Sequence, residues 1–242
     1  MHLSRLVLNP RSRAVRNDLS DCRSLHRTIL SAFPQAQKEQ GGARAEFGLL
    51  FRADAEPRSG RITLLVQSSV EPDWSRAPKD YLLDDFGELD NPAVKRIDEV
   101  YDALGKGARL RFRLRANPTK RLPLLIENRV GKERGKRVEI FREEDQLAWL
   151  ARKAGEHGFR LLAARINPKV LNARANPESK VIGWRDRSRP PMKFGSALFD
   201  GELEIADAEK FRQTLAGGIG SGKAYGFGLL SIAPIGAGRG AE

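Results

Sequence analysis

The sequence predicts an α+β protein made of two tandem domains with antiparallel sheets. Three observations lead to this prediction. The chain has 242 residues, which exceeds the commonest size of one domain and suffices for two cores. Its first half reads as strand, helix, strand, strand, weak helix and strand, and its second half repeats the alternation of strands and helices. We therefore place the domains at residues 1–119 and 120–242.

The first half carries the clearer pattern of elements. Apolar residues alternate with polar ones in its last strand and recur every three or four residues in its main helix. The expected strands cover residues 3–9, 46–53, 61–69 and 109–116, and the expected helices cover residues 20–33 and 94–104. This split βαβ order is that of a ferredoxin-like (RRM-like, βαββαβ) unit, in which helices cover one face of a four-stranded sheet. The expected strands lack the spaced aromatic residues of the RNP1 motif, so we do not expect bases to stack on the sheet in the usual RRM manner.

The second half begins near Lys120, after the Asn117-Pro118 step. Its best helix covers residues 142–158, where acidic residues in the first turn suit the helix dipole and two glycines help to end the helix. Further strands are expected at residues 159–166, 180–184, 195–205 and 227–235, with a helix at residues 206–216. The second half is therefore expected to form a second ferredoxin-like unit beside the first.

Composition and charge narrow the function. The chain has 43 Lys and Arg against 31 Asp and Glu, a net charge of +12, and such a surface attracts polyanions because binding releases their condensed counterions. We therefore expect a nucleic-acid partner. The single cysteine excludes an internal disulfide, the first residues lack the features of a signal peptide, and no stretch has the roughly 18 apolar residues of a membrane span. A cytoplasmic protein without a membrane partner is the simplest interpretation.

Neither a metal nor another cofactor is expected. The three histidines and one cysteine are too few and too scattered for a zinc site. The acidic cluster Asp84, Asp85, Glu88 and Asp90 is the one group that could hold magnesium for two-metal nuclease chemistry. A solvated turn is the preferred interpretation, because the cationic surface that an RNA substrate needs lies elsewhere in the sequence.

A glycine-dense loop at residues 217–230 points to phosphate binding. Few side chains cover its backbone N–H groups, and Gly217, Gly222 and Lys223 stand at the offsets of a P-loop. Ala224, however, stands where a P-loop has the Ser or Thr that holds magnesium. A P-loop also follows a strand and opens a helix, whereas this loop follows an expected helix and precedes an expected strand. The loop is therefore predicted to be a helix-to-strand connector and not an ATP site.

His26 is the candidate for proton transfer. In the helix expected at residues 20–33, His26 lies at the edge of the apolar stripe and flanks the core. Imidazole can give and take protons near neutral pH, so a general acid or base is one interpretation, and a packed histidine with a satisfied hydrogen bond is the other. Arg23 and Arg27 bracket His26 on the neighbouring face and could hold a phosphate beside the ring.

A cationic track follows the strand expected at residues 109–116. Alternation places its arginines on one face and its apolar residues on the other. The track consists of Arg111, Arg113, Arg115, Lys120 and Arg121. An anion lying across the strand would explain this charge, and pairing with acidic neighbours of the sheet is the alternative.

Six stretches of the sequence together resemble one protein family. They are LSRLVLNPRSRAVRNDL, LHRTILSAF, VQSSVEPDWS, LRFRLRANPTKR, LAWLARKAGEHGFRLL and GIGSGKAYGFGLLSIAP. The glycine loop alone is unspecific, but its combination with FRLRANP and a histidine on the first helix is specific. On these stretches the chain resembles the CasE family, the CRISPR repeat-processing endoribonucleases of the type I-E Cascade complex, over nearly its whole length.

The resemblance implies a fold, an activity and a partner. It implies two ferredoxin-like domains and metal-independent cleavage of precursor CRISPR RNA at the base of the repeat hairpin. The product is then retained in a complex with other Cascade subunits. In this scheme His26 matches the catalytic histidine, and the ribose 2′-hydroxyl beside the scissile phosphate is the nucleophile. Cleavage leaves a 2′,3′-cyclic phosphate and a 5′-hydroxyl, so DNA is expected to bind without being cut.

One position departs from the family pattern, in which a tyrosine stands three residues before the histidine. This chain has Arg23 there, and we expect Arg23 to neutralise the charge that develops on the phosphate, with Tyr225, Lys169 and Lys223 as alternatives. The residues expected to contact RNA are Arg27, Arg111, Arg113, Arg115, Lys120, Arg121, Gly220, Gly222 and Lys223. A non-catalytic RNA-binding subunit of a CRISPR complex, with a structural His26, is the alternative function.

Overall fold

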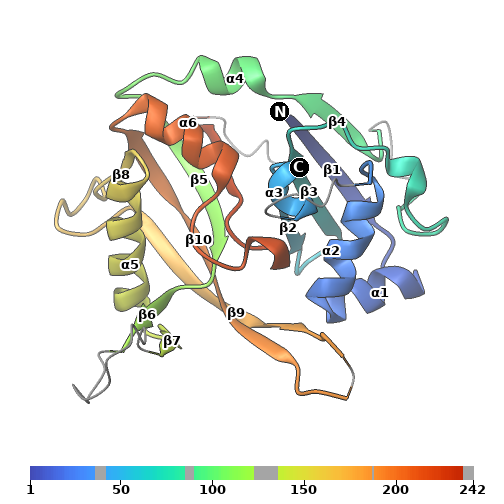
Figure 1. Ribbon diagram of the computed structural model, residues 1–242. Helices are drawn as coiled ribbons and strands as arrows, with labels where there is room; N and C mark the ends of the chain where they lie inside the picture. Colours follow the sequence, from blue (N-terminus) through green and yellow to red (C-terminus); the bar gives the residue numbers. More distant parts are fainter. Residues whose placement is uncertain (36–41, 85–89, 123–135, 187, 237–242) are drawn as a thin grey trace, which may run out of the picture.

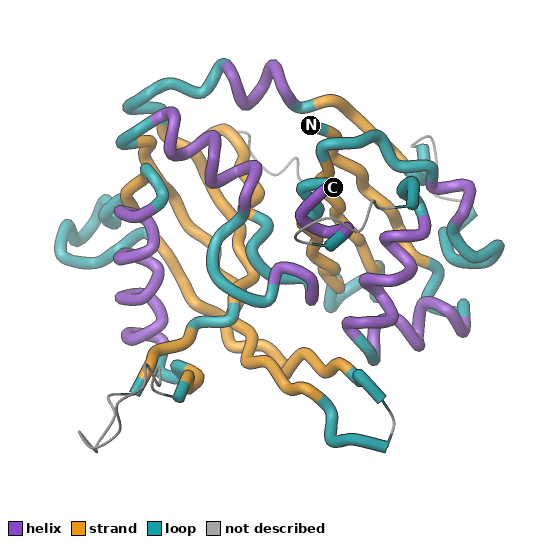
Figure 2. The backbone as a smooth tube through the Cα atoms, in the orientation of Figure 1, coloured by secondary structure: helices purple, strands orange, loops and turns teal. Residues whose placement is uncertain are grey.

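The structure is a computed structural model that describes residues 1–35, 42–84, 90–122, 136–186 and 188–236. The chain forms two α+β units that lie side by side, each with an antiparallel sheet and helices packed against it (Figures 1 and 2). Each unit has a separate cluster of buried apolar residues. The predicted α+β class is confirmed.

The sheet of the first unit has the strand order β2-β3-β1-β4. These strands are β1 (His2–Leu8), β2 (Leu50–Ala55), β3 (Ile62–Ser68) and β4 (Ala93–Arg96). The helices of this unit are α1 (Arg13–Ser20), α2 (Cys22–Ser31), α3 (Ala43–Glu46) and α4 (Asp98–Asp102), with the 3-10 turn η1 (Trp74–Arg76). Leu25 and Ile29 of α2 pack with Leu6 and Leu64 of the sheet in one buried cluster. The order of strands along the chain and across the sheet is that of a ferredoxin-like unit.

The sheet of the second unit has the order β11-β5-β10-β8 and repeats the arrangement of the first. Its strands are β5 (Arg109–Ala116), β8 (Phe159–Leu161), β10 (Met192–Ile205) and β11 (Leu230–Pro234). The other elements are α5 (Glu143–Glu156), α6 (Ala208–Gly217), the turn η2 (Lys223–Tyr225), and the strands β6 (Thr119–Arg121), β7 (Arg137–Glu139) and β9 (Ala173–Gly183). Trp149 of α5 and Phe211 of α6 pack in the same buried cluster as Phe112 and Phe199 of the sheet.

The strand at residues 109–116 belongs to the second sheet, so its predicted place as the fourth strand of the first unit was wrong. β5 pairs with β10 and β11, and its apolar positions lie in the core beneath α5 and α6. The fourth place in the first sheet is taken by β4, which pairs with β1. Because β4 has four residues that are mostly exposed, it shows no apolar alternation. Since β5 opens the second unit, we propose a domain boundary between α4 and β5.

Other elements lie where the sequence predicted them, but β9 begins before the predicted residues 180–184 and β8 ends before the predicted residue 166. The helix predicted at residues 20–33 is α2, and it follows a separate helix, α1, that was not predicted. The weak helix predicted at residues 94–104 is divided between β4 and α4. In the acidic cluster, Asp85 and Glu88 lie outside the described residues. Within the described ranges there is no group of histidine, cysteine or acidic residues that could hold a metal, and no helix there is long and apolar enough to cross a membrane.

A long hairpin of β9 and β10 reaches from the second unit to the first (Figure 1). Beyond the sheet, the first residues of β10 pair only with β9, and the tip of the hairpin meets the start of α2. There the backbone N–H of Trp184 donates a hydrogen bond to Asp21 Oδ1 at 3.1 Å, and Gly183 packs against the side chain of Cys22. The hairpin therefore fixes the position of α2 relative to the second sheet.

A buried arginine also joins the two units. Arg52 on β2 is 2% exposed, and its Nε donates to both carboxylate oxygens of Asp54 at 2.9 Å. Its Nη1 donates to the carbonyl of Arg113 on β5 at 3.3 Å and to Ser231 Oγ on β11 at 3.0 Å. A single side chain of the first sheet thus binds two strands of the second.

We predict that Arg52→Ala destabilises the protein strongly. Removing one partner of a buried, hydrogen-bonded ion pair costs about 3–5 kcal/mol, because the groups left behind lose their partners without regaining water. Urea unfolding followed by circular dichroism measures the change. The matched control is Arg160→Ala, which breaks an ion pair of the exposed Arg160 with Glu204 and should cost about 1 kcal/mol or less. Equal losses for the two variants would contradict the assigned role of Arg52.

Candidate catalytic site and nucleic-acid interface

Helix α2 places His26 where the two units meet. The carboxylate of Asp21 caps the helix by accepting a hydrogen bond from the backbone N–H of Arg23 at 3.0 Å. Leu25 and Ile29 turn into the core of the first unit, so His26 lies beside them at the edge of the buried face, as the sequence predicted. The neighbouring turn across the interface is η2, within the glycine loop.

The glycine loop connects α6 to β11, so the predicted helix-to-strand order is confirmed. Gly218 ends α6 with φ +73°, and a Cβ atom there would lie 2.8 Å from the carbonyl oxygen of Gly228 and from Leu50 Cδ2. Only glycine combines this conformation with such close packing. Gly226 likewise packs against Phe51. The loop therefore lies directly against the start of β2, on the side where His26 is found.

The imidazole of His26 is held against the aromatic ring of Phe51, with the ring centroids 6.1 Å apart and the planes inclined by 22°. Its Nε2 atom is buried and has no hydrogen-bond partner in the described part of the chain. Burial, together with the smaller effects of the charges of Arg44 and Arg23, lowers the pKa of His26 to about 4. The side chain is therefore neutral at pH 7, with a nitrogen that no group of the described residues satisfies.

Arg44 is a cation of this site that the sequence analysis missed. Its Nη1 donates to the carbonyl of Leu49 at 3.3 Å, next to the residues of β2 that the glycine loop contacts. Lys223 is bound to the carbonyl of Gly217 in the same loop, and burial followed by the charge of Arg44 lowers the pKa of Lys223. Arg44 lies in a four-residue helix without apolar periodicity, so the sequence offered no signal for it.

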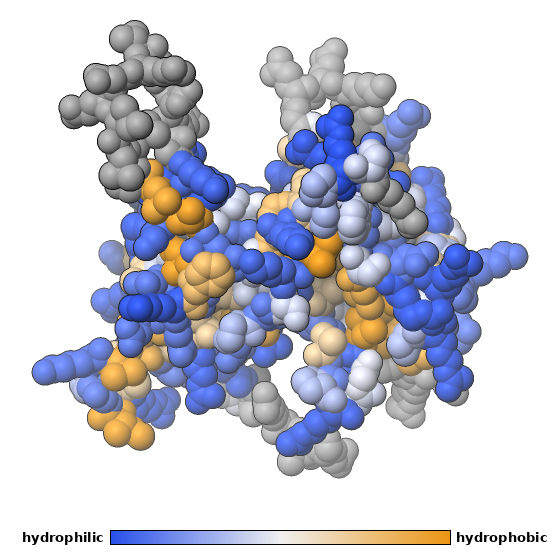
Figure 3. Space-filling view, turned by 90° about the horizontal axis from the view of Figure 1, so that it is seen from below, coloured by the Kyte–Doolittle hydropathy of each residue, from blue (hydrophilic) through white to orange (hydrophobic). Residues whose placement is uncertain are grey.

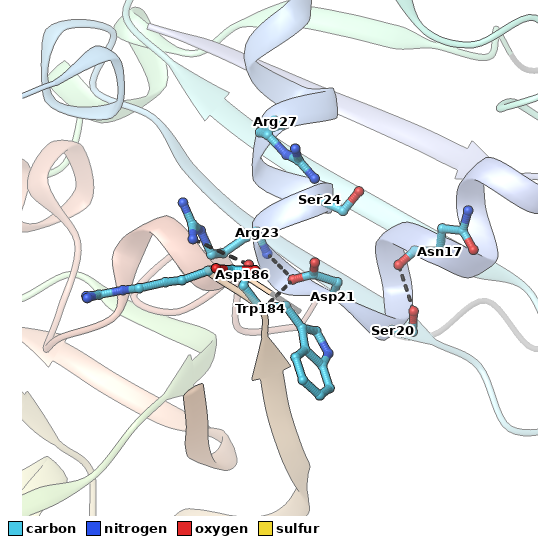
Figure 4. Close-up of a pocket in the computed structure, with 9 residues that line it drawn as sticks. Asn17, Ser20, Asp21, Arg23, Ser24, Arg27, Trp184 and Asp186 are labelled. Carbon is cyan, nitrogen blue, oxygen red and sulfur yellow. Dashed lines mark hydrogen bonds between the residues drawn. The ribbon is translucent and has the colours of Figure 1, made fainter. Parts of the chain in front are cut away.

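Arg23 and Arg27 line a cavity of about 700 Å³ between the α1–α2 corner and the tip of the β9–β10 hairpin (Figure 4). Arg23 Nη1 donates to the carbonyl of Trp184 at 3.3 Å, so the guanidinium crosses from α2 to the hairpin. The charge of Arg23 also contributes to lowering the pKa of His26. Of the alternatives to Arg23, Lys223 lies close enough to Arg44 for that charge to lower the pKa of Lys223, whereas Tyr225 stacks on Phe194 with centroids 4.8 Å apart. Lys169 lies in an exposed loop beside another cavity, over the second sheet.

A second basic cavity, of about 590 Å³, lies on the second unit between the glycine loop and α5. The structure here brings together several residues that the sequence predicted to contact RNA. These are Lys120, Arg121, Gly220 and Lys223, joined by the basic residues Arg137, Arg152, Lys153 and His157. Gly222 precedes η2 in the same loop with φ +78°. Figure 3 shows that the face from which the hairpin projects is mostly hydrophilic, with hydrophobic residues in small separate groups.

The arginines of β5 have a different environment. Arg113 Nε donates to Asp200 at 2.6 Å, and Arg115 is paired with Glu178 at 2.6 Å. Arg111 and Arg113 line a cavity over the second sheet, apart from the cavity that holds Lys120 and Arg121. These ion pairs favour the alternative that acidic neighbours compensate the strand. Contact of Arg111, Arg113 and Arg115 with RNA stays a prediction.

Comparison with known proteins shows the family to which this chain belongs. The family of CRISPR associated proteins matches residues 1–234. The chain is 38% identical over 241 residues to the CRISPR-associated endoribonuclease Cse3 of Thermus thermophilus, covering 97% of this chain and 100% of Cse3. It is 34% identical over 147 residues to the CRISPR system Cascade subunit CasE of Escherichia coli, covering 59% of this chain and 66% of CasE.

A solved structure agrees with these relatives. Thermus thermophilus Cse3, bound to an RNA representing a pre-cleavage complex, superposes on this chain with a TM-score of 0.73 and 36% identity, covering 96% of this chain and 98% of that one. The resemblance predicted from the sequence is thereby confirmed. The chain belongs to the family of CRISPR-associated proteins that includes Cse3 and CasE.

Proposed function

We propose that the chain is an endoribonuclease that cleaves precursor CRISPR RNA at the base of the repeat hairpin, without a metal, and keeps the product as a Cascade subunit. The observation that carries this proposal is the half-buried, neutral imidazole of His26 at the junction of two units, with the charges of Arg44 and Arg23 acting on it. The name of the relative Cse3 and its RNA-bound structure support the substrate class. The Cascade subunit CasE supports the assembly, and a cytoplasmic location follows from this role.

In the proposed reaction the ribose 2′-oxygen attacks the adjacent phosphorus. A P–O bond to the 2′-oxygen forms and the bond to the 5′-oxygen breaks, which gives a 2′,3′-cyclic phosphate and a 5′-hydroxyl. Neutral His26 removes the proton from the 2′-hydroxyl and can return it to the leaving 5′-oxygen. Cations stabilise the charge that builds on the phosphate oxygens, and we assign this role to Arg23 and Arg44, whose charges act on His26.

The covered Nε2 of His26 sets a condition on this reaction. Because the atom is buried in the free protein, the imidazole has to turn, or the glycine loop has to move, before the nitrogen meets a hydroxyl group. Phosphate binding would favour either change, since the cations beside His26 repel one another until an anion joins them. Catalytic hydrogen bonds often form only in the complex with substrate.

The basic cavity of the second unit is proposed to hold the stem of the hairpin. Lys120, Arg121 and Lys223 lie at its wall, together with N–H groups of the glycine loop. Such contacts bind phosphate without reading sequence, and binding weakens as the salt concentration rises. They position the RNA, while the site at α2 performs the chemistry.

The alternative is a subunit that binds repeat RNA without cutting it. Two observations favour this alternative: Arg23 stands where family members carry a tyrosine, and the Nε2 atom of His26 is covered. In that case His26 would serve only to pack α2 against Phe51.

We predict a pH profile that distinguishes the two functions. If the neutral form of His26 acts as general base, kcat/KM for repeat RNA rises as that group loses its proton near pH 4 and stays level up to about pH 8. Because the pKa of His26 is lowered to about 4, most of the side chain is already in the neutral, active form at pH 5, so the rise in kcat/KM is complete below neutral pH. Cleavage should be measured with EDTA throughout and with circular dichroism as a check of folding. A midpoint near 6.5, the ordinary value of histidine, would contradict the assignment, and binding without cleavage at every pH would support the alternative.

A further inference from the structure

The cavity at the α1–α2 corner has features that the cleavage step does not use. It lies between α2 and the tip of the β9–β10 hairpin, and its volume of about 700 Å³ suits a ligand of nucleotide size (Figure 4). Arg23 forms one wall beside the catalytic helix, Arg27 lies one turn further along α2, and Trp184 and Arg185 come from the hairpin. Residues of both units therefore line this one cavity.

The charge of this cavity favours an anion. In the described ranges Arg23, Arg27 and Arg185 form no ion pair with a carboxylate, and the only side-chain hydrogen bond among them joins Arg23 to the carbonyl of Trp184. The two acids of the cavity are already engaged. Asp21 accepts from two backbone N–H groups, and Asp186 accepts from the N–H and hydroxyl of Ser188.

Trp184 supplies an aromatic surface in the same place. Its side chain is 39% exposed, which makes it one of the few exposed large apolar side chains in the described part of the protein. Its backbone is held from both sides, because its N–H donates to Asp21 at 3.1 Å and its carbonyl accepts from Arg23 at 3.3 Å. An exposed indole that lines the same cavity as guanidinium groups without a carboxylate partner is a combination that binds single-stranded nucleic acid, by stacking a base and neutralising a phosphate.

We propose that this cavity binds an unpaired nucleotide of the repeat that flanks the hairpin, with the base on Trp184 and phosphates on Arg27 and Arg185. The inference rests on the proposed function, since it specifies a part of the same substrate. Arg23 lies three residues before His26 on α2, so the two side chains are neighbours on the helix surface. A strand leaving the site at His26 can therefore enter the cavity directly. A duplex would not suit it, because paired bases do not expose a face for stacking.

Binding of two RNAs tests this proposal. One RNA is the repeat hairpin with its single-stranded flanks, the other is the stem-loop alone, and affinity is measured by fluorescence anisotropy in the His26→Ala background so that neither is cut. Trp184→Ala should weaken binding of the flanked RNA by about 5- to 150-fold, the equivalent of losing one stacked base, and leave the stem-loop unchanged. Arg185→Ala should act in the same direction, and Trp184→Phe should retain most of the affinity.

The matched control is Arg58→Ala, which removes one exposed charge in the turn between β2 and β3. Arg58→Ala should not weaken binding of the flanked RNA more than binding of the stem-loop. Equal losses on the two RNAs for Trp184→Ala, or no loss on either, would overturn the proposed subsite while leaving the cleavage function intact. If the parent protein binds neither RNA, the proposed function itself fails, and the subsite fails with it.

Discussion

His26→Ala is expected to slow the cleavage of repeat RNA by about 10²- to 10⁴-fold, the usual contribution of a positioned acid or base. The affinity for the RNA should stay within about threefold, because a neutral imidazole adds no charge to phosphate binding. The protein should also remain folded, since the side chain is only partly buried and its Nε2 atom has no hydrogen bond to lose in the described structure. Single-turnover cleavage and equilibrium binding, measured on the same RNA, separate the two effects.

His2→Ala is the matched control for this experiment. His2 starts β1, where it pairs with Ser68 of β3 and Arg96 of β4, and it belongs to neither the candidate catalytic site nor the two basic cavities, so its loss should leave both cleavage and binding unchanged. Full cleavage by the His26 variant would show that another group moves the proton. Loss of binding together with cleavage would instead make His26 a structural residue.

The sequence predicted the fold better than it predicted the partners of each strand. The alternation of Leu110, Phe112 and Leu114 with arginines identified a strand correctly, but that pattern is satisfied by any sheet with an apolar core beneath it. Only the pairing with β10 and β11 places this strand in the second unit. The short β4 could not be predicted because its exposed residues show no alternation.

The candidate site was predictable where it depends on local pattern. His26 could be placed at the edge of an amphipathic helix, and the glycines of residues 217–230 indicated a helix-to-strand connector whose backbone N–H groups are open to a phosphate. Arg44 and Trp184 could not be predicted, because each reaches the site through contacts between distant segments. The sequence also could not decide whether Arg113 and Arg115 meet RNA or acidic neighbours, since Asp200 and Glu178 come from other strands.

Removing one oxygen atom from the RNA is expected to have the largest effect of all. A repeat RNA with a 2′-deoxy sugar at the cleaved position lacks the proposed nucleophile, so no cyclic phosphate can form and cleavage at that position should stop. Binding should change little, because the phosphates and the stem are intact. This outcome does not depend on which cation near His26 stabilises the transition state.

The most direct test of the central claim is therefore cleavage of this 2′-deoxy RNA and of its all-ribose counterpart by the purified protein in EDTA. The account predicts that the ribose RNA is cut at one position to give a 2′,3′-cyclic phosphate and a 5′-hydroxyl, while the deoxy RNA is bound and stays whole. Cleavage of the deoxy RNA at the same position, or cleavage of the ribose RNA only when magnesium is restored, would contradict it.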